Sequence, residues 1–314
     1  MALGNHSTIT EFLLLGLSTS PQVQTLLFVL FLNIYLLTIL GNLMMLLVIR
    51  ADSHLHTPMY FFLSHLSFLD LCLSSVTVPR MLRDLLSEIK TISVRGCLAQ
   101  SFFVFITAGT EGFLLSVMAY DRYAAICHPL LYGQMMRKEL CVQLVLGSWG
   151  LGFFNALINI LLATDMEFCE SHIINHYSCE VPSLFPLSCS DISTNLIVLF
   201  CSTLLHGFGT FFPIILSYAC IVSTILSISS TSGRKKAFST CSSHLMTVIF
   251  FYCSGFLRYL MPTSGSPLEL IFSVQYSYTV VTPMLNPLIY SLKNKEVKAA
   301  LTRTLEKYLQ HIRC

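Results

Sequence analysis

Long apolar runs separated by short polar segments fill most of the chain. Seven runs are long enough for a helix to cross the roughly 30 Å hydrocarbon core of a bilayer, which takes about 20 residues. The runs cover residues 23–49, 57–78, 97–119, 140–164, 195–228, 237–257 and 270–292. They are continuously apolar, whereas the strands of a membrane β-barrel are shorter and alternate in polarity. The pattern therefore predicts an all-α integral membrane protein, one seven-helix bundle formed by residues 1–314.

Composition supports a membrane environment and argues against one class of binding partner. Hydrophobic residues make up 54% of the chain, charged residues only 11%, and the mean hydropathy is +0.71, far from the soluble globular range. The lipid bilayer is therefore the expected solvent. A net charge of +2 argues against nucleic acid as a partner.

Basic residues predict the orientation of the chain, because Lys and Arg remain in cytoplasmic loops. Thirteen of the 18 would lie on the side of the C-terminal tail and five on the other side. Residues 1–22 are then extracellular, where the sequon at Asn5 could be glycosylated. Residues 1–20 have no basic n-region, so we expect no removable signal peptide. The tail, residues 293–314, would be cytoplasmic.

Four cysteines lie in segments predicted to be extracellular, namely Cys97, Cys169, Cys179 and Cys189. The oxidising side of the membrane favours two disulfides, although four cysteines allow three pairings. His172, His176, Cys179 and Glu180 offer a competing interpretation as a metal site, which a disulfide at Cys179 would weaken by removing its thiolate. We therefore expect no metal and favour a hydrogen-bonded loop.

Several motifs follow one another along the chain. Asp121 and Arg122 end the third run, where an ion pair could act as a latch. Pro283 and Pro287 would kink the seventh run, because proline removes a backbone donor. The remaining motifs are Asn42, the segment Pro58-Met59-Tyr60-Phe61-Phe62, Asp70, and the segment Lys236-Ala237-Phe238-Ser239-Thr240-Cys241. Together they resemble the rhodopsin-like G-protein-coupled receptors and, within them, the vertebrate odorant receptors.

The resemblance extends over nearly the whole chain, from Phe12 to Asn294. Tyr252 is similar to the odorant-receptor pattern, whereas Cys253 departs from the glycine that is usual there. The resemblance implies the pairings Cys97 with Cys179 and Cys169 with Cys189. It also implies a heterotrimeric stimulatory olfactory G protein as partner, a plasma-membrane location in olfactory sensory neuron cilia, and no enzyme activity, catalytic residue or cofactor. The residues it assigns to activation and G-protein coupling are Asp121, Arg122, Tyr123, Tyr218, Asn286, Pro287 and Tyr290.

Helical spacing brings small and apolar residues of the third run together, which favours a ligand cavity. These residues are Val104, Phe105, Ala108, Gly109 and Gly112. Receptors for charged amines carry Asp at the position of Val104, so a neutral, small volatile odorant is the expected ligand. Positions that match the pocket lining of the family are Ser202, Thr203, His206, Tyr252, Gly255, Phe256, Tyr259, Tyr276 and Thr279, any of which could instead serve interhelical packing.

Asp70 and Glu111 are the two acids within the apolar runs, and such residues are costly there. The resemblance places both with Asn42 and Asn286 in a central polar site. Two interpretations stay open, a switch sensitive to sodium or protons and a structural hydrogen-bonded network.

Apolar residues after the last run recur at helical spacing among basic ones, which predicts a short amphipathic helix along the inner leaflet. Cys314 could be palmitoylated.

Other classes of protein fit the sequence less well. A transporter or channel would need a continuous polar path and often repeated spans. An enzyme would need a catalytic motif, and neither a nucleophile elbow nor a phosphate-binding loop is present in the sequence. A rhodopsin-like receptor for another class of small molecule is the nearest alternative.

Overall fold

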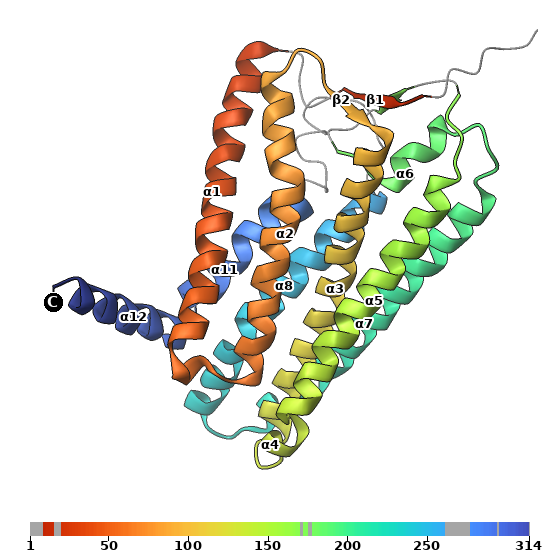
Figure 1. The fold of residues 1–314 in the computed structure, drawn as a ribbon. Coiled ribbons are helices and arrows are strands. Elements are labelled where there is room, and N and C mark those ends of the chain that lie inside the picture. The colour runs from red at the N-terminus through yellow and green to blue at the C-terminus, as the bar shows by residue number, and fades with distance from the viewer. Residues whose placement is uncertain are drawn as a thin grey trace, which may run out of the picture.

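The computed structural model describes residues 9–15, 20–169, 172–174, 178–260, 277–293 and 295–313. Long helices dominate it, as predicted from the apolar runs (Figure 1). They are α1 (Pro21–Ala51), α2 (Pro58–Leu86), α3 (Val94–Cys127), α5 (Lys138–Thr164), α7 (Ser193–Ser227), α8 (Thr231–Leu260) and α11 (Thr282–Lys293), and α12 (Lys295–Arg313) follows them. Shorter elements are the 3-10 helices η1 (Ser53–Leu55) and η2 (Phe185–Leu187), the single turns α4 (Tyr132–Met135) and α6 (Val181–Leu184), and the π-helical turn η3 (Ser277–Val281).

Helix α3 lies in the middle of the bundle, where it contacts α2, α5, α7 and α8. Its N-terminus is capped by Ser93, whose hydroxyl accepts a hydrogen bond from the Gly96 N–H at 3.1 Å. The end of the bundle near Cys97 is called the disulfide end below, and the end near Asp121 and Arg122 the Asp-Arg end. Helix α3 therefore runs from the disulfide end to the Asp-Arg end in contact with four other long helices.

Most helices extend beyond the predicted runs, because charged residues can continue a helix where it leaves the hydrocarbon. Helix α2 continues to Leu86 and includes Arg80, which pairs with Asp84 one turn later. Helix α3 continues to Cys127 and includes Asp121 and Arg122. Five helices, α1, α2, α3, α5 and α7, are long and apolar enough to cross a membrane among the described residues, and α8 contains a shorter apolar stretch, Cys241–Ser254.

A small three-stranded sheet lies over the disulfide end, and the sequence pattern did not predict it (Figure 1). Its central strand β1 (Glu11–Leu14) pairs antiparallel with β2 (Thr91–Ser93) and parallel with β3 (Ile173–Ile174). Phe12, Leu14 and Ile92 bury their side chains beneath it, beside Cys97 and Cys179. Because this sheet is short, the all-α prediction is confirmed for the bundle and is incomplete for its cap.

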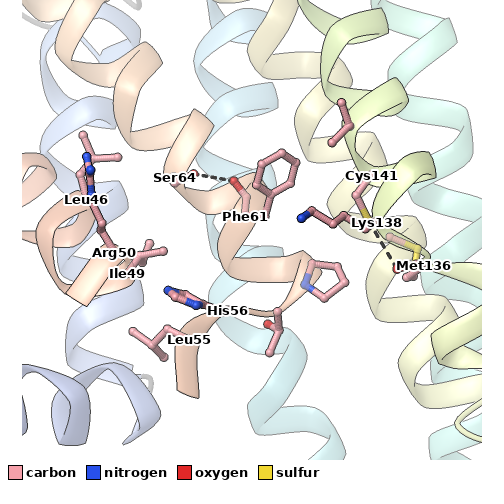
Figure 2. Close-up of a pocket in the computed structure, with 13 residues that line it drawn as sticks. Leu46, Ile49, Arg50, Leu55, His56, Phe61, Ser64, Met136, Lys138 and Cys141 are labelled. Carbon is pink, nitrogen blue, oxygen red and sulfur yellow. Dashed lines mark hydrogen bonds between the residues drawn. The ribbon is translucent and has the colours of Figure 1, made fainter. Parts of the chain in front are cut away.

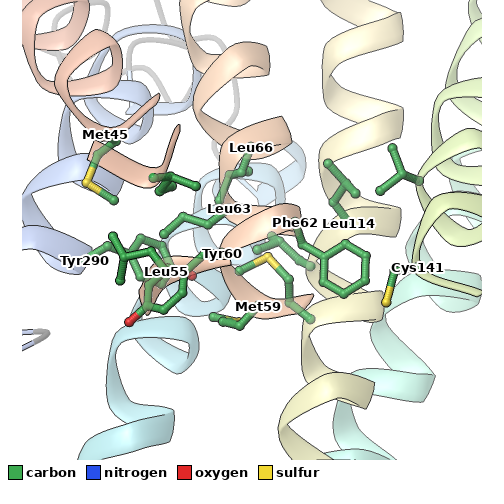
Figure 3. Close-up of a cluster of buried hydrophobic side chains, with 14 of the residues drawn as sticks. Met45, Leu55, Met59, Tyr60, Phe62, Leu63, Leu66, Leu114, Cys141 and Tyr290 are labelled. Atoms are coloured by element: carbon green, nitrogen blue, oxygen red, sulfur yellow. The ribbon is translucent and has the colours of Figure 1, made fainter. Parts of the chain in front are cut away.

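The largest hydrophobic core lies at the Asp-Arg end (Figure 3). Leu63 and Leu66 of α2, Leu114 of α3 and Tyr290 of α11 are almost completely buried in it. The outward faces of the helices are apolar instead of polar, with Leu205 72% exposed. A soluble protein hides such side chains, so this surface suits lipid.

The predicted C-terminal helix is present as α12, which turns away from the bundle (Figure 1). Val297 and Ala300 bury one face of it, while Glu296 and Lys298 are exposed. Its position depends on Asp52, which accepts hydrogen bonds from the His54 N–H at 3.0 Å and Arg303 Nε at 2.8 Å. One carboxylate thus joins the turn after α1 to α12.

Candidate functional site

The predicted ligand-binding residues of α3 face α5 and α7. Gly109 is buried, and a Cβ added to it would lie 3.2 Å from the Cα of Gly152 and 3.4 Å from His206 Nε2. Val104, Phe105 and Ala108 are half-buried, and Phe105 packs against the apolar cluster under the sheet. The space that small residues open along α3 is therefore partly filled by α5 and by the ring of His206.

His206 on α7 presents a polar atom to the inside of the bundle. Its Nδ1 lies 2.9 Å from the Ser202 carbonyl oxygen, so Nδ1 carries the proton and donates it. The other nitrogen, Nε2, is then an acceptor, and it is buried without a hydrogen-bond partner among the described residues. The ring also makes an edge contact with Phe113, at 5.2 Å between ring centroids. His206 is therefore a hydrogen-bond acceptor held at a fixed place in an apolar setting.

The hydroxyls near His206 already have partners within the protein. Ser202 Oγ donates to the Val198 carbonyl and accepts from Asn159 Nδ2 at 3.2 Å, and Thr203 donates to Leu199. Tyr252 on α8 shares a hydrogen bond of 2.6 Å with Thr210 on α7. The Asn159–Ser202 and Tyr252–Thr210 bonds join neighbouring helices, as the packing interpretation of the same residues predicts.

The rest of the predicted ligand set is only partly described. Thr279 is buried, in the π-helical turn before α11. Helix α8 includes residues 255, 256 and 259, whose side chains lie outside the described part of the structure, as does the whole of Tyr276. Asn5 also lies outside the described residues.

Two disulfides hold the long loop between α5 and α7, and they join Cys97 to Cys179 and Cys169 to Cys189. The loop is also hydrogen-bonded to α3, because Gln100 Oε1 accepts from the Cys179 N–H at 3.0 Å and Ser101 Oγ donates to the Cys179 carbonyl at 3.2 Å. The loop therefore lies directly over the α3 end of the predicted ligand site. With Cys179 in a disulfide, the competing metal site loses its thiolate, and its His176 lies outside the described residues.

A polar cluster is buried between α1, α2 and α11. Asn286 Nδ2 donates to both carboxylate oxygens of Asp70, at 3.0 and 3.3 Å. Asn42 Nδ2 donates to the Pro283 carbonyl at 2.9 Å, which lacks its usual helical partner because Pro287 has no N–H. Glu111 of α3 is also buried and interacts electrostatically with Asp70. Asn286 and Glu111 thus lie beside Asp70, and Asn42 is bonded to the same helix as Asn286; these are the four residues that the resemblance placed in one polar site.

At the Asp-Arg end, Asp121 is completely buried and bonded on both oxygens. Arg122 forms an ion pair with one oxygen, and Tyr132 of α4 donates to the other at 2.7 Å. Burial, followed by the neighbouring Asp121 carboxylate, raises the pKa of the Tyr132 hydroxyl above its ordinary value, so the hydroxyl remains a donor at physiological pH. Helix α3 is therefore tied to the turn that follows it.

Tyr218 and Tyr290 lie nearby but do not bond Asp121. Tyr218 Oη lies 2.7 Å from His244 Nδ1, and the two rings are stacked. His244 Nε2 in turn lies 3.0 Å from the Leu115 carbonyl on α3. Tyr290 is buried in the hydrophobic core, and Tyr123 bonds His128 at 2.9 Å. Arg122 and Tyr218 thus have separate partners in this structure.

The sequence alone did not identify Tyr132, His244, Gln100 or Gly152. Tyr132 lies in a polar segment without a motif, and His244 reads as one more residue of an apolar run. Gln100 and Gly152 act through backbone contacts, which leave no pattern along a single chain. Their partners are 11 to 129 residues distant, and only the folded chain brings them together.

The arrangement of helices is similar to that of squid rhodopsin, with a TM-score of 0.72 over 93% of this chain and 83% of that chain, at 18% sequence identity. This likeness and the central polar cluster define a seven-helix bundle of the rhodopsin type. Residues 31–308 match the sequence model of the family described as olfactory receptor.

Two relatives make the family plain. Olfactory receptor 8S1 of Homo sapiens is 74% identical over 298 residues, which are 95% of this chain and 82% of the relative. Olfactory receptor 5G9 of Mus musculus is 49% identical over 98% of both chains. The chain belongs to the olfactory receptor family of rhodopsin-like G-protein-coupled receptors. It is therefore a multi-pass plasma-membrane receptor and not an enzyme, with a small ligand and a G protein as partners.

Proposed function

We propose that this chain is an odorant receptor that binds small, mostly neutral volatile molecules inside the bundle. The observation that carries the proposal is the buried, unpartnered Nε2 of His206, opposite Gly109 and within the ligand set expected for the family. Such an acceptor in an apolar wall suits a ligand with one O–H or N–H donor. A small ligand gains at most about 1.5 kcal/mol per heavy atom, so the expected potency is micromolar.

The proposed ligand site is closed from above by the loop that Cys179 anchors. Ser101 and Gln100 hold this loop on α3, one to two turns from Val104 and Ala108. A volatile molecule bound between α3, α7 and α8 would contact residues of all three helices. It can activate only by binding more tightly to the active arrangement than to the closed one.

For transduction, we propose coupling to a stimulatory olfactory G protein, which raises cAMP. The N-terminus would be extracellular, the Asp-Arg end cytoplasmic, and the receptor located in olfactory cilia. In the closed arrangement Arg122 is bound by Asp121, and Tyr218 by His244. On activation, Arg122 and Tyr218 would leave these partners and stabilise the open cytoplasmic end for the G protein.

The central cluster would act as a switch sensitive to sodium or protons. Asp70 and Glu111 are both buried, and the Oδ1 atoms of Asn42 and Asn286 have no hydrogen-bond partner among the described residues. A cation or a shared proton would relieve the repulsion between the two acids. If Asp70→Asn and Glu111→Gln leave both signalling and its sodium and pH dependence unchanged, the cluster is a structural network instead.

The first experiment is to express the receptor with a stimulatory olfactory G protein and to screen neutral volatiles for cAMP production. Pairs of an alcohol and its methyl ether test the role of His206. We expect the alcohol to be about fivefold more potent, because one net hydrogen bond contributes about 1 kcal/mol. His206→Leu should abolish this difference, and His206→Gln, which keeps an acceptor, should retain part of it.

Arg122→Ala provides the inactive control at equal surface expression. A response that survives Arg122→Ala would argue against G-protein coupling through this end of the bundle. If the expressed receptor raises no cAMP with any volatile, the proposal fails, and a receptor for another class of small molecule is favoured.

A further inference from the structure

A cavity of about 800 Å³ lies at the outside of the bundle, between the Asp-Arg ends of α1, α2 and α5 (Figure 2). It is separate from the proposed odorant site, which lies between α3, α7 and α8. Its lining includes exposed side chains, among them His56, Thr57 and Val142, so it opens outwards and not into the core. Whatever occupies it comes from the surroundings of the receptor.

Three basic side chains line this cavity, one from each side and one between them. Arg50 is in the last turn of α1, His56 is in the turn before α2, and Lys138 is the first residue of α5 (Figure 2). No acidic residue lines the cavity. The two cations, Arg50 and Lys138, therefore face one volume without a carboxylate to neutralise them.

Some arginines near the ends of the bundle are already neutralised by an acid. Arg80, Arg122 and Arg303 each form an ion pair with an aspartate. Arg50 and Lys138 have no ion-pair or hydrogen-bond partner in the described parts of the chain. Two neutral polar groups of the cavity already have partners, since Ser64 donates to the Phe61 carbonyl at 2.7 Å and Cys141 donates to the Met136 carbonyl. The basic groups and the Thr57 hydroxyl therefore remain available to a ligand.

The walls of the cavity are apolar. Leu46 and Ile49 of α1, Phe61 of α2 and Val142 of α5 form them. Further along the same helices, away from the Asp-Arg end, exposed Leu43, Phe68 and Leu146 continue an apolar surface. Because α1 ends and α2 and α5 begin here, the cavity is at the depth where lipid headgroups meet water.

We propose that this cavity binds an anionic phospholipid of the membrane. Its phosphate group would lie between Arg50 and Lys138, and an acyl chain would follow the apolar walls along α1, α2 and α5. Both halves of the cavity are needed by such a ligand, since a free phosphate leaves the walls uncovered and a neutral lipid leaves the cations unpaired. The site requires neither an odorant nor a G protein.

Native mass spectrometry of the purified full-length receptor tests the proposal directly. The detergent-solubilised protein is titrated with phosphatidylserine and, separately, with phosphatidylcholine. Each basic residue near an anionic headgroup contributes about fivefold in affinity, so Arg50→Gln with Lys138→Gln should weaken phosphatidylserine binding about 25-fold. Phosphatidylcholine binding should be weaker than that of phosphatidylserine and should change little in the double variant.

A matched control removes the same charge from the same end of the receptor. Arg234→Gln with Lys235→Gln alters two exposed residues of α8 that do not line the cavity, and should keep the original affinity. Val142→Ser should weaken binding without a change of charge. All four altered side chains of the two double variants are exposed, so a monomeric elution profile is expected for both.

Three results would overturn the proposal. They are equal affinity for the two phospholipids, equal loss in both double variants, and displacement of phosphatidylserine by excess inorganic phosphate. The last of these would show that the cations recognise phosphate without the lipid.

Discussion

At the scale of single residues, a close contact between α3 and α5 depends on Gly152. A Cβ at this position would lie 2.9 Å from both the Ile106 carbonyl oxygen and the Thr110 backbone nitrogen of α3. Backbone atoms cannot turn aside as a flexible side chain can, so α3 and α5 approach this closely only because position 152 is glycine. Helical spacing grouped Gly109 with the other small and apolar residues of α3, but it could not reveal that Gly152 faces it.

We predict that Gly152→Ala separates α3 from α5 and destabilises the receptor by about 1–3 kcal/mol, the usual cost of overpacking. The thermal denaturation midpoint of the solubilised receptor measures this effect. Gly150→Ala is the matched control, because a Cβ there meets no atom within 4 Å. Equal midpoints for the two variants would show that the contact between α3 and α5 is not tight.

At the scale of elements, Asp52 determines where α12 lies. The backbone N–H of His54, then its ring and Arg303, hold the pKa of the Asp52 carboxyl well below its usual range. A lowered pKa in the folded state stabilises the protein above the carboxyl's ordinary pKa, and that stabilisation is lost only as the pH falls through the lowered value. Docking of α12 should therefore be unchanged between pH 8 and pH 5.

We predict that Asp52→Asn or Arg303→Gln speeds hydrogen exchange in α12 at neutral pH. Each substitution removes the ion pair between Asp52 Oδ2 and Arg303 Nη2, which lie 2.7 Å apart. Lys298→Gln removes a charge from the exposed face of the same helix and should leave the exchange unchanged. The role given to Asp52 would be contradicted if, in the unaltered receptor, the α12 amides lost protection from hydrogen exchange between pH 8 and pH 5. The comparison is made after correction for intrinsic exchange rates.

Among the elements, α12 could be predicted from the sequence and the three-stranded sheet could not. The amphipathic pattern after residue 293 identified α12, because helical periodicity is a local property. The sheet was missed, because β1 is four residues long and pairs with strands beginning at Thr91 and Ile173. Such pairing leaves no signal near residue 11.

At the scale of the whole molecule, the proposed mechanism makes activity depend on an equilibrium between closed and open arrangements of the bundle. In this mechanism, the closed arrangement is held at the Asp-Arg end by two side chains that bond Asp121. They are Arg122 and Tyr132. Apolar runs and motifs predicted the helices and the ion pair. They did not predict Tyr132, whose role depends on how the turn α4 folds beneath α3.

We predict that Tyr132→Phe raises basal cAMP production, because it removes a hydrogen bond of 2.7 Å to a buried carboxylate. Such a bond contributes about 1.5 kcal/mol, so the equilibrium should shift towards the open form by up to about tenfold. Asp121→Asn should act in the same direction. Tyr35→Phe on α1 is the control. If Tyr35→Phe raises basal cAMP production as much as Tyr132→Phe does, the bond between Tyr132 and Asp121 does not hold the closed arrangement.

The strand order of the three-stranded sheet also determines when that sheet can be completed during synthesis. Strand β1 is made first, yet its parallel neighbour β3 is translated about 160 residues later, roughly 10–30 s at ordinary ribosome speeds. Throughout that interval the first segment of the chain has an open edge that can pair with the wrong strand. Quality control in the secretory pathway would thus meet an N-terminal segment that is the first to emerge but is not fully paired until more than half of the chain has been made.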